Sequence, residues 1–528
     1  MLRIDQLRLL PDEPETVLLH KCARLLRVEP SALTGLTVLR RAIDARESLT
    51  FVYTVIVSAP QETALPRRCR DKRVTAYAPE QYALPASVDA PAVRPIVVGA
   101  GPAGLFAALV LAKCGARPIL LERGQCVEQR QRDVQRFWAT GELDTESNVQ
   151  FGEGGAGAFS DGKLNTGTRD VRHRFIMEQL VSCGAPADIL TDALPHVGTD
   201  MLHIALQRLR RQLLDAGADI RFGARLEGLT VQEGAVTAVT VRKGGTLYTL
   251  PARQVVLALG HSARDTFEML YDAGAAMEQK PFAMGVRIEH RQSAVDAARY
   301  RRLAGHPSLP PATYKLSCHL PNGRSAFSFC VCPGGQVVAA ASEARRVVTN
   351  GMSEYARDRE NINGALLVNV TPADFPDDHP LSGIRFQRQL EEAAFALGGG
   401  DYRAPCQRVE DFLAGRPSVG AGNVQPSYLP AVTYTDLHRC LPPFISETLA
   451  LALPELGRRL RGYDDPDALL TGVETRSSSP VRLVRDGHYE SNIRGVYPCG
   501  EGAGYAGGIL SAAADGMRCA EKILEVYR

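Results

Sequence analysis

The chain has 528 residues, a formal net charge of +2 and a hydrophobic content of 45%. A chain of this length can bury a large core and is typical of about two to four domains. Its nearly balanced charge gives no electrostatic reason to expect a nucleic acid or an acidic membrane surface as a partner.

The N-terminus carries acidic residues and a proline where a secretory signal would need an apolar run. The longest apolar stretches, such as Leu105–Ala112, are far shorter than a membrane span. Twelve cysteines are scattered without a regular framework, which favours reduced thiols over disulfides. We therefore expect a cytoplasmic protein without a membrane partner.

The first 78 residues read as a small α+β domain. Strand-like segments rich in β-branched and aromatic residues surround a segment with apolar residues at helical spacing. Prolines and small residues without periodicity follow from Tyr77 to Pro95, and they predict a linker over residues 79–93.

An α/β pattern begins at residue 94. A short apolar strand, a helix ended by Gly115 and a second strand come first. Later, Thr199–Gly217 predicts a long amphipathic helix, four short strands follow it, and "QVVLALG" forms a further strand that ends at Gly260. A last helix is expected at the C-terminus, after a cluster of five glycines.

A glycine loop joins the first strand of this pattern to its helix. In Gly99-x-Gly101-x-x-Gly104, the first glycine allows a tight turn, the second a close approach to a pyrophosphate, and the third close packing of helix on strand. Glu122, eighteen positions later, ends the second strand, where it can bind ribose hydroxyls. The acid argues against NADP, but the loop alone leaves NAD and FAD open. The candidate cofactor-binding residues are Gly99, Gly101, Pro102, Ala103, Gly104, Glu122 and Arg123.

Two stretches, "GAGPAGL" and "LLERG", resemble the opening of two-dinucleotide-binding flavoproteins. In that group a late strand, loop and helix cover the flavin, and the usual Gly-Asp pair is Gly500-Glu501 here. The resemblance implies that Glu501 binds ribityl hydroxyls and that the helix beginning near Gly507, Gly508 and Ile509 points at the flavin pyrimidine edge. The strand ending at Gly260 resembles one that lies near the cofactor in the same group.

The segment Gln150–Gly167 holds six glycines in eighteen residues and predicts a loop. As a cofactor loop, it would place Gly154, Gly155 and Gly157 along the pyrophosphate and the ring. Ser160 and Lys163 would then reach flavin or substrate. The alternative interpretation is a surface loop.

Several further stretches, including "MGVRIEH", "FSFCVCPGG", "VVTNGMSEYARD" and "GVETRSSSPVRL", resemble a family of poorly characterised bacterial FAD-dependent dehydrogenases. The resemblance implies non-covalently bound FAD and an α/β fold, in which a Rossmann-like FAD-binding domain carries an inserted α+β substrate domain and a small N-terminal α+β domain. The expected parts are an N-terminal domain (1–78), a linker (79–93), the FAD-binding domain (94–265), a substrate or cap domain (266–470) and a C-terminal return (471–528).

Four residues are candidates for chemistry, and a fifth, His261, is a candidate for a cofactor contact. Arg476 could clamp a substrate carboxylate or the flavin edge, or form a structural ion pair with a neighbour such as Glu474. His290 could act as acid or base, or be a core histidine. Cys330 and Cys332 could be strand thiols, a redox pair or, with less support, metal ligands. His261 follows Gly260 and could touch the cofactor.

The resulting hypothesis is an FAD-dependent oxidoreductase acting on a small organic substrate. No second GxGxxG follows a strand, so NAD(P)H would serve only as a transient donor that visits the substrate pocket or the surface. The alternatives are a flavin-dependent monooxygenase and a non-catalytic, redox-sensing flavoprotein that docks a protein partner through its N-terminal domain.

Overall fold

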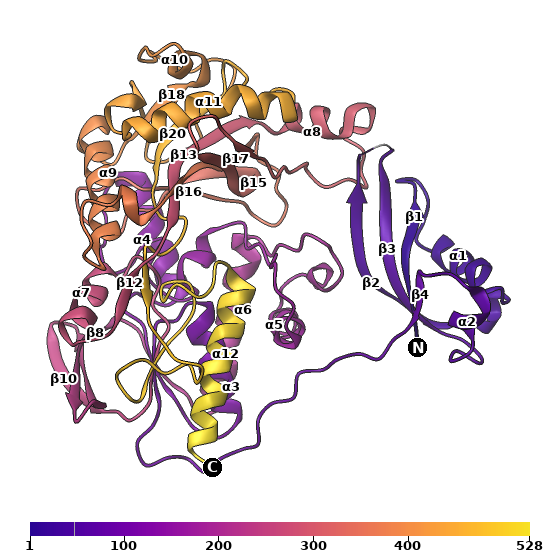
Figure 1. The fold of residues 1–528 in the computed structure, drawn as a ribbon, viewed down its shortest axis with the longest axis horizontal. Coiled ribbons are helices and arrows are strands. Elements are labelled where there is room, and N and C mark those ends of the chain that lie inside the picture. The colour runs from indigo at the N-terminus through magenta and orange to yellow at the C-terminus, as the bar shows by residue number, and fades with distance from the viewer. Residues whose placement is uncertain (47) are drawn as a thin grey trace.

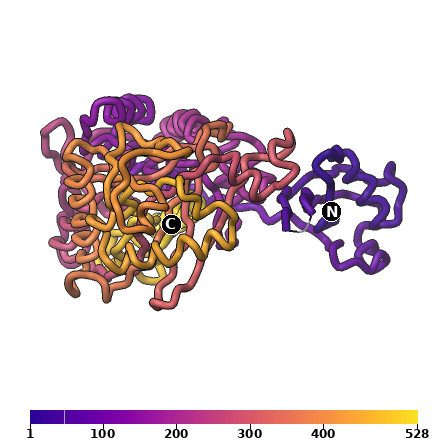
Figure 2. Tube along the Cα trace, turned by 90° about the horizontal axis from the view of Figure 1, so that it is seen from above, coloured from indigo at the N-terminus to yellow at the C-terminus, as the bar shows by residue number. Residues whose placement is uncertain are grey.

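The computed structural model describes residues 1–46 and 48–528. A small N-terminal unit stands beside a larger body, with its sheet toward the body and its helices on the far side (Figure 1). Seen from above, this unit projects from one side of the molecule (Figure 2).

The N-terminal unit is a four-stranded antiparallel sheet in the order β2-β3-β1-β4. Inward residues along the first strand, such as Leu2 and Ile4, are buried and alternate with exposed ones, as expected for a sheet with one covered face. Its elements are β1 (Leu2–Leu9), α1 (Val17–Leu26), β2 (Thr34–Asp44), β3 (Thr50–Ser58), α2 (Leu65–Cys69) and β4 (Val74–Ala76).

The segment from residue 77 to residue 95 contains no helix or strand and lies along the body. The amide of Val88 donates to the carbonyl of Cys114 at 2.8 Å, and the Tyr82 hydroxyl bonds Glu521 at 2.8 Å. The N-terminal unit also meets the body at Arg41, which forms an isolated β-bridge and an ion pair with Asp192.

A five-stranded, wholly parallel sheet in the order β22-β11-β5-β6-β7 forms the centre of the body. Its middle strands are buried along their whole length because both faces are covered, which explains their uniformly apolar sequences. The strands are β5 (Ile96–Val98), β6 (Ile119–Leu121), β7 (Asp219–Arg221), β11 (Val255–Leu257) and β22 (Val496–Pro498).

One face of this sheet is covered by helices. The C-terminal helix lies directly against the first helix after the glycine loop (Figure 1). A Cβ atom at Gly516 would lie 2.0 Å from the carbonyl oxygen of Ala103, so this crossing requires a glycine. The helices of this part are α3 (Pro102–Lys113), α4 (Val127–Thr140), α5 (Val171–Ser182), α6 (Thr199–Asp215), α7 (Arg264–Asp272) and α12 (Ile509–Val526).

A three-stranded antiparallel sheet covers the other face of the parallel sheet. A separate two-stranded antiparallel sheet belongs to the same part of the body. The strands are β8 (Ala224–Gln232), β9 (Ala235–Lys243) and β10 (Thr246–Pro251), with β12 (Met277–Gln279) paired to β21 (Val481–Leu483).

The remainder of the body is built on an eight-stranded mixed sheet with helices packed against it. Its path is β14-β15-β17-β13-β20-β18-β19, and β16 pairs with β15 beside that path. The strands are β13 (Phe282–Arg291), β14 (Ser317–His319), β15 (Ser325–Ala339), β16 (Thr349–Met352), β17 (Asn361–Val370), β18 (Ala404–Arg408), β19 (Val432–Tyr434) and β20 (Leu469–Glu474). The helices are α8 (Gln292–Tyr300), α9 (Ser382–Gly398), α10 (Val409–Leu413) and α11 (Pro443–Arg459).

The predicted α/β fold class, with a Rossmann-like domain and two further α+β parts, is confirmed. The helix predicted at Thr199–Gly217 is α6, and the short strand ending before Gly260 is β11. The glycine-rich segment Gln150–Gly167 is a loop containing one short 3-10 turn, Gly155–Phe159. Among residues 1–46 and 48–528, no helix has the length and apolar character needed to cross a membrane.

Candidate functional site

A cavity of about 440 Å³ lies between the glycine loops of the parallel sheet and side chains of the eight-stranded sheet. It brings together residues that are hundreds of positions apart in sequence. Of the predicted cofactor-binding residues, those that line it are Gly99, Gly101, Pro102, Ala103, Glu122, Arg123, Gly155, Gly157, Gly260, Glu501, Gly507, Gly508 and Ile509.

The first glycine loop has the geometry that its spacing predicts. Gly99 has a φ of +102°, and a Cβ there would lie 2.5 Å from the carbonyl oxygen of Ala258. A Cβ at Gly104 would lie 1.8 Å from the carbonyl oxygen of Gly99, so this residue serves helix packing and lies outside the cavity lining. At Gly101, in contrast, a Cβ would meet no protein atom closer than 3.9 Å, which leaves open space at the start of α3.

Glu122 joins two loops that both border the cavity. One carboxylate oxygen accepts a hydrogen bond from the amide of Ala100 at 2.7 Å. The other accepts from the amides of Gly124 at 2.8 Å and Gly152 at 2.9 Å. This buried carboxylate therefore positions both the first glycine loop and the middle glycine loop, a structural role beyond the ribose contact that the sequence predicts.

The middle glycine loop is anchored by the side chain of Arg130, which is fully buried on α4. Its guanidinium donates to four backbone carbonyls, those of Asn148, Val149, Gly152 and Glu153. Burial lowers the pKa of Arg130 to about 10, although the nearby carboxylates of Glu122 and Glu153 oppose this shift. Sequence reasoning missed Arg130, because nothing in an amphipathic helix marks one arginine as the anchor of a distant loop.

Gly154 belongs to this loop but does not line the cavity. It has a φ of +87°, and a Cβ there would lie 2.4 Å from Cδ1 of Leu206 on α6. Its role is close packing rather than the predicted cofactor contact.

The late glycine cluster is held by an ion pair between α12 and the preceding loop. Arg485 binds Asp515 with distances of 2.8 and 2.9 Å, and Asp515 also accepts from the amide of Gly500 at 2.8 Å. Gly500 packs against Ala103 and lies outside the cavity lining, so the prediction that it contacts the cofactor is not supported by its position. Gly507 and Gly508 do line the cavity, at the N-terminus of α12.

His261 and Glu501 form a pair at the cavity wall. Nδ1 of His261 lies 2.7 Å from Oε2 of Glu501, and the other oxygen of Glu501 accepts from the amide of Ser479 at 2.8 Å. Burial would raise the pKa of Glu501, but the hydrogen bonds and charge of its partners outweigh burial and lower it. Nε2 of His261 is buried and bonds no residue in the described part of the chain.

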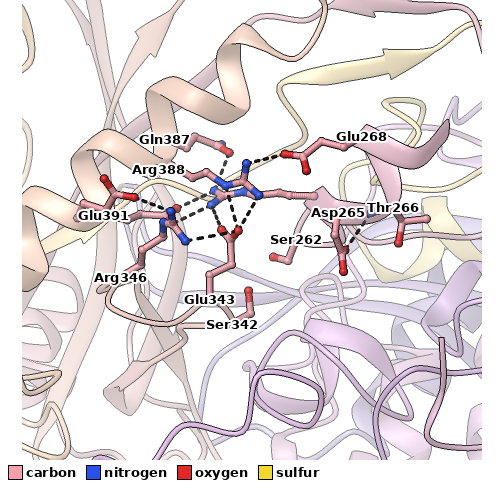
Figure 3. A network of polar contacts seen from close by, with 12 residues as sticks. Ser262, Asp265, Thr266, Glu268, Ser342, Glu343, Arg346, Gln387, Arg388 and Glu391 are labelled. Atoms are coloured by element: carbon pink, nitrogen blue, oxygen red, sulfur yellow. Dashed lines mark hydrogen bonds and ion pairs between the residues drawn. The ribbon is translucent and has the colours of Figure 1, made fainter. Parts of the chain in front are cut away.

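Arg476 sits in a buried network with a second arginine. Its guanidinium binds the two oxygens of Glu391 at 3.0 and 2.8 Å, and Nη1 donates to Ser262 at 3.0 Å and Ser342 at 2.6 Å. Arg264 binds the same Glu391 carboxylate at 2.7 and 2.8 Å. Arg264 also pairs with Glu343 at 2.5 Å, and Figure 3 shows the ion pairs that converge on Glu343 and Glu391. The predicted ion pair of Arg476 thus exists, but its partner is Glu391 rather than Glu474.

Glu474 pairs instead with Arg287 on the neighbouring strand β13, at 2.7 Å. Burial raises the pKa of Glu474 to about 7, and the Arg287 charge only partly offsets this. Neither the Arg264–Glu391 pair nor the Arg287–Glu474 pair has a local sequence signature, because the partners come from separate elements.

Cys330 and Cys332 lie at the far side of the cavity on β15. Cys330 lines the cavity and Cys332 is fully buried behind it. All twelve cysteines of the chain are free thiols. Lys163, from the middle glycine loop, also lines the cavity, next to these thiols.

His290 does not line the cavity, so its position gives no support to the predicted catalytic role. It lies in the core of the eight-stranded sheet, where Nε2 bonds the carbonyl of Tyr463 at 2.8 Å and the ring packs against Tyr314. Burial lowers its pKa, so the neutral ring is favoured. The alternative interpretation, a core histidine, describes it.

The cavity fits FAD on two structural grounds. Open space at Gly101 and at Gly507, where a Cβ would meet no atom within 3.9 and 4 Å respectively, allows close approach of a ligand to the backbone. The N-termini of α3 and α12 both border the cavity, and unpaired amides at helix N-termini favour phosphate and other anions.

Comparison with known proteins agrees with this fit. Residues 94–158 match the FAD binding domain family, and residues 281–477 match the family described as FAD-dependent protein, C-terminal domain-like. Residues 1–58 match a domain of unknown function, DUF8436. An uncharacterised protein of Clostridium beijerinckii is 44% identical over 531 residues, covering 100% of this chain and 99% of that protein.

Solved structures with a distant likeness include a triple mutant of the flavin-dependent brominase Bmp2, with 12% identity, 82% of this chain and 80% of that chain covered, and a TM-score of 0.38. Another is the glycerol-3-phosphate dehydrogenase of Bacillus halodurans complexed with FAD, with 12% identity, coverages of 84% and 64%, and a TM-score of 0.34. The family matches and the full-length relative show that this chain is a member of a family of FAD-dependent proteins and that its cofactor is FAD.

Proposed function

We propose that this flavoprotein is an FAD-dependent oxidoreductase that transfers hydride or electrons between its flavin and a small organic substrate. The observation that carries the proposal is the shared cavity, which glycine loops border on one side and ionisable side chains of the eight-stranded sheet border on the other. Bound FAD supplies two-electron redox chemistry, while the protein supplies placement, electrostatics and proton transfer.

The residues for cofactor binding follow from the cavity walls. The backbone at Gly101 and Gly155 would hold the pyrophosphate at the N-terminus of α3, with Glu122 at the ribose. The N-terminus of α12 at Gly508 would face the flavin, where its dipole favours negative charge.

Proton transfer is assigned to His261. Because Glu501 accepts from Nδ1, the neutral ring presents Nε2 as a proton acceptor, and Nε2 has no partner among the described residues. Glu501 orients the ring through Nδ1, as a carboxylate beside a general base does. A substrate C–H or O–H donor in the cavity would then lose its proton to Nε2.

Arg476 contributes indirectly. Its guanidinium is already engaged by Glu391, Ser262 and Ser342, so its role is to fix the cavity wall rather than to clamp a substrate carboxylate alone. Lys163 and the exposed part of Cys330 remain to contact substrate.

The N-terminal unit is proposed to dock a protein partner. Its sheet carries the exposed Arg3 and Arg40 on the face away from α1, and Arg40 lines a hollow that Arg299 on α8 of the body also borders. A pull-down with the intact chain and with a variant carrying alanine at both arginines tests this part, and equal recovery of the same partner from both would contradict it.

The principal test is spectroscopic. The purified holoprotein is mixed with NADH or NADPH without oxygen, and the flavin absorption is followed. Bleaching followed by reoxidation with an organic acceptor supports an oxidoreductase. Rapid reoxidation by oxygen with substrate hydroxylation would support a monooxygenase instead, and no reduction by any organic donor would leave only the non-catalytic alternative.

A further inference from the structure

We propose that Cys330 and Cys332 are a redox-active dithiol that exchanges two electrons with the cofactor of the cavity that Cys330 lines. The inference rests on the proposed function, because it requires flavin in that cavity. It gives the enzyme a second redox centre made entirely of its own side chains.

The first ground is accessibility. Ten of the twelve cysteines are buried, and only Cys126 and Cys330 are half-buried. Of these two, Cys330 lines the cavity and Cys126 does not. A thiol that exchanges electrons with a bound cofactor has to reach the cofactor's cavity, and Cys330 alone meets this condition among the cysteines.

The second ground is the irregular backbone of β15 at this pair. Cys330 has a φ of +42°, in the left-handed region that a non-glycine residue rarely adopts. Pairing with β17 shifts register between Phe329 and Cys332. Such bulges redirect side chains near active sites, and strained backbone of this kind concentrates at functional positions.

The third ground is the proximity of the two thiols. The thiol of Cys332 donates to the carbonyl oxygen of Cys330 at 3.3 Å, which places its sulfur beside the Cys330 residue. A spacing of two residues can place both sulfur atoms on one side of a strand, close to the separation that a disulfide needs.

The fourth ground is the charge around the pair. Lys163 from the middle glycine loop and Arg287 from β13 are the cations that face both thiols, and Asp161 and Glu474 are the neighbouring acids. Nη1 of Arg287 donates to the carbonyl of Cys330 at 2.8 Å. Positive charge beside a partly accessible cysteine favours its thiolate, which is the reactive form.

These contacts divide the two sulfur atoms into different roles. The hydrogen bond from Cys332 and the charges of Lys163 and Arg287 lower the pKa of Cys330 against the effect of burial. The hydrogen bond to Cys330 and burial raise the pKa of Cys332. Cys330 is therefore the cysteine that loses its proton more readily and Cys332 the one that keeps it, as expected for an attacking and a resolving cysteine.

The buried amine of Lys163 adds an independent observation. Its Nζ forms an ion pair with Asp161 at 2.9 Å but makes no hydrogen bond to the described residues. Asp161 is itself bound by Arg357 at 2.9 Å, so its charge is shared between two cations. This leaves Lys163 with hydrogen-bond capacity toward the cavity and the thiols.

The proposed step is balanced between the dithiol and FAD. An S–S bond forms between the thiolate of Cys330 and the sulfur of Cys332, while two electrons and the single proton of Cys332 would pass to oxidised FAD, which is the two-electron acceptor. In the reverse direction, reduced FAD would donate two electrons and one proton, the S–S bond breaks, Cys332 regains its proton and Cys330 is released as the thiolate.

The first experiment needs no flavin chemistry. The full-length apoprotein and holoprotein are exposed to a mild thiol oxidant, free thiols are alkylated, and peptides are identified by mass spectrometry. We expect Cys330 and Cys332 to be joined while Cys126 stays open to alkylation. Free Cys330 and Cys332 under conditions that oxidise a small dithiol would overturn the inference.

The second experiment counts electrons. Anaerobic titration of the oxidised holoprotein with dithionite should consume about four electrons per FAD in the wild type and in C126S, and about two in C330S and C332S. Consumption of about two electrons in the wild type would contradict a redox-active pair, even if the flavin turns over.

A positioning role for Lys163 is tested by alkylation rate. The variant K163M should slow modification of Cys330 by iodoacetamide about tenfold near neutral pH, while the labelling of Cys126 stays unchanged. Disulfide formation and the electron count are measured without an organic substrate. If both succeed but no substrate is turned over, only the proposed function is rejected. If substrate is turned over but neither the disulfide nor the extra electrons are found, only this inference is rejected.

Discussion

Nδ1 of His261 lies 2.7 Å from Oε2 of Glu501, although 240 residues separate them in the chain. The parallel neighbours β11 and β22 end at the same edge of the sheet. His261 follows β11 and Glu501 follows β22, so the two side chains meet at that edge. Carboxyl ends of parallel strands are where ligands bind in open α/β sheets. The pair therefore lies at the cavity wall, with Nε2 of His261 free of any partner among the described residues.

We expect H261N to lower the rate of the substrate half-reaction about a hundredfold to ten-thousandfold, since it removes a general acid–base group. Flavin content should stay close to wild type. Stopped-flow measurement of flavin reduction across a pH series checks this. H20N, which changes an exposed histidine on α1, is the control. An unchanged pH profile in H261N would reject the assigned proton transfer.

G101A separates cofactor binding from folding. A Cβ at Gly101 meets no protein atom closer than 3.9 Å, so the apoprotein should melt at nearly the wild-type temperature. The added methyl occupies space at the cavity lining, so FAD affinity should fall about fivefold to a hundredfold. Fluorescence titration of apoprotein with FAD measures this.

Two other glycine variants serve as controls for G101A. G99A should destabilise the apoprotein itself, because its Cβ would lie 2.5 Å from the Ala258 carbonyl oxygen and its φ is +102°. G487A should change nothing, because open space surrounds that position. Equal FAD affinity of G101A and G487A would show that Gly101 does not contact the cofactor.

E391Q removes the carboxylate shared by two buried arginines, Arg264 and Arg476. Breaking one partner of a buried ion pair costs about 3–5 kcal/mol, because the remaining charges are left uncompensated. The apparent melting temperature should fall clearly by differential scanning calorimetry. E392Q, on an exposed neighbour paired with Arg346, should have little effect. Similar melting of the two variants would contradict the assigned role of Glu391.

The same carboxylate predicts a pH dependence. Burial would raise the pKa of Glu391, but its two arginine partners lower it well below its usual value of 4.5. A carboxylate with a lowered folded pKa contributes stability above its unfolded pKa and loses it as the pH falls toward the folded pKa. Wild type should therefore lose stability below about pH 5 more steeply than E391Q. Parallel melting curves in acid would oppose this.

R41A tests how the N-terminal unit is tethered. The Arg41 side chain pairs with Asp192 at 2.9 Å while half exposed, so its loss should cost at most about 1 kcal/mol. The backbone bonds of Arg41 to Thr191 and Ala193 remain. Limited proteolysis between residues 77 and 95 should accelerate about threefold to fivefold. R24A, on an exposed face of α1, should be cut at the wild-type rate.

Much of the cofactor site follows from local sequence. The Gly99 loop, α3 and Glu122 form one continuous segment in which turn geometry, helix start and strand end are set by neighbouring residues. Short-range rules apply to such segments, so the spacing of glycines and acid was sufficient to predict a dinucleotide-binding unit, whereas the choice of FAD over NAD rested on the resemblance of several stretches to known flavoproteins.

The chemistry of the cavity was decided only by tertiary structure. Arg476 pairs with Glu391 rather than with the nearby Glu474, and His290 points into a core instead of the cavity. Arg130 anchors a loop through hydrogen bonds to four carbonyls, and no sequence pattern predicts these bonds. Buried charges and polar groups need partners, and these come from elements that are distant in sequence but adjacent in the fold. Which elements are adjacent is set by the packing of whole sheets and helices, not by spacing along the sequence.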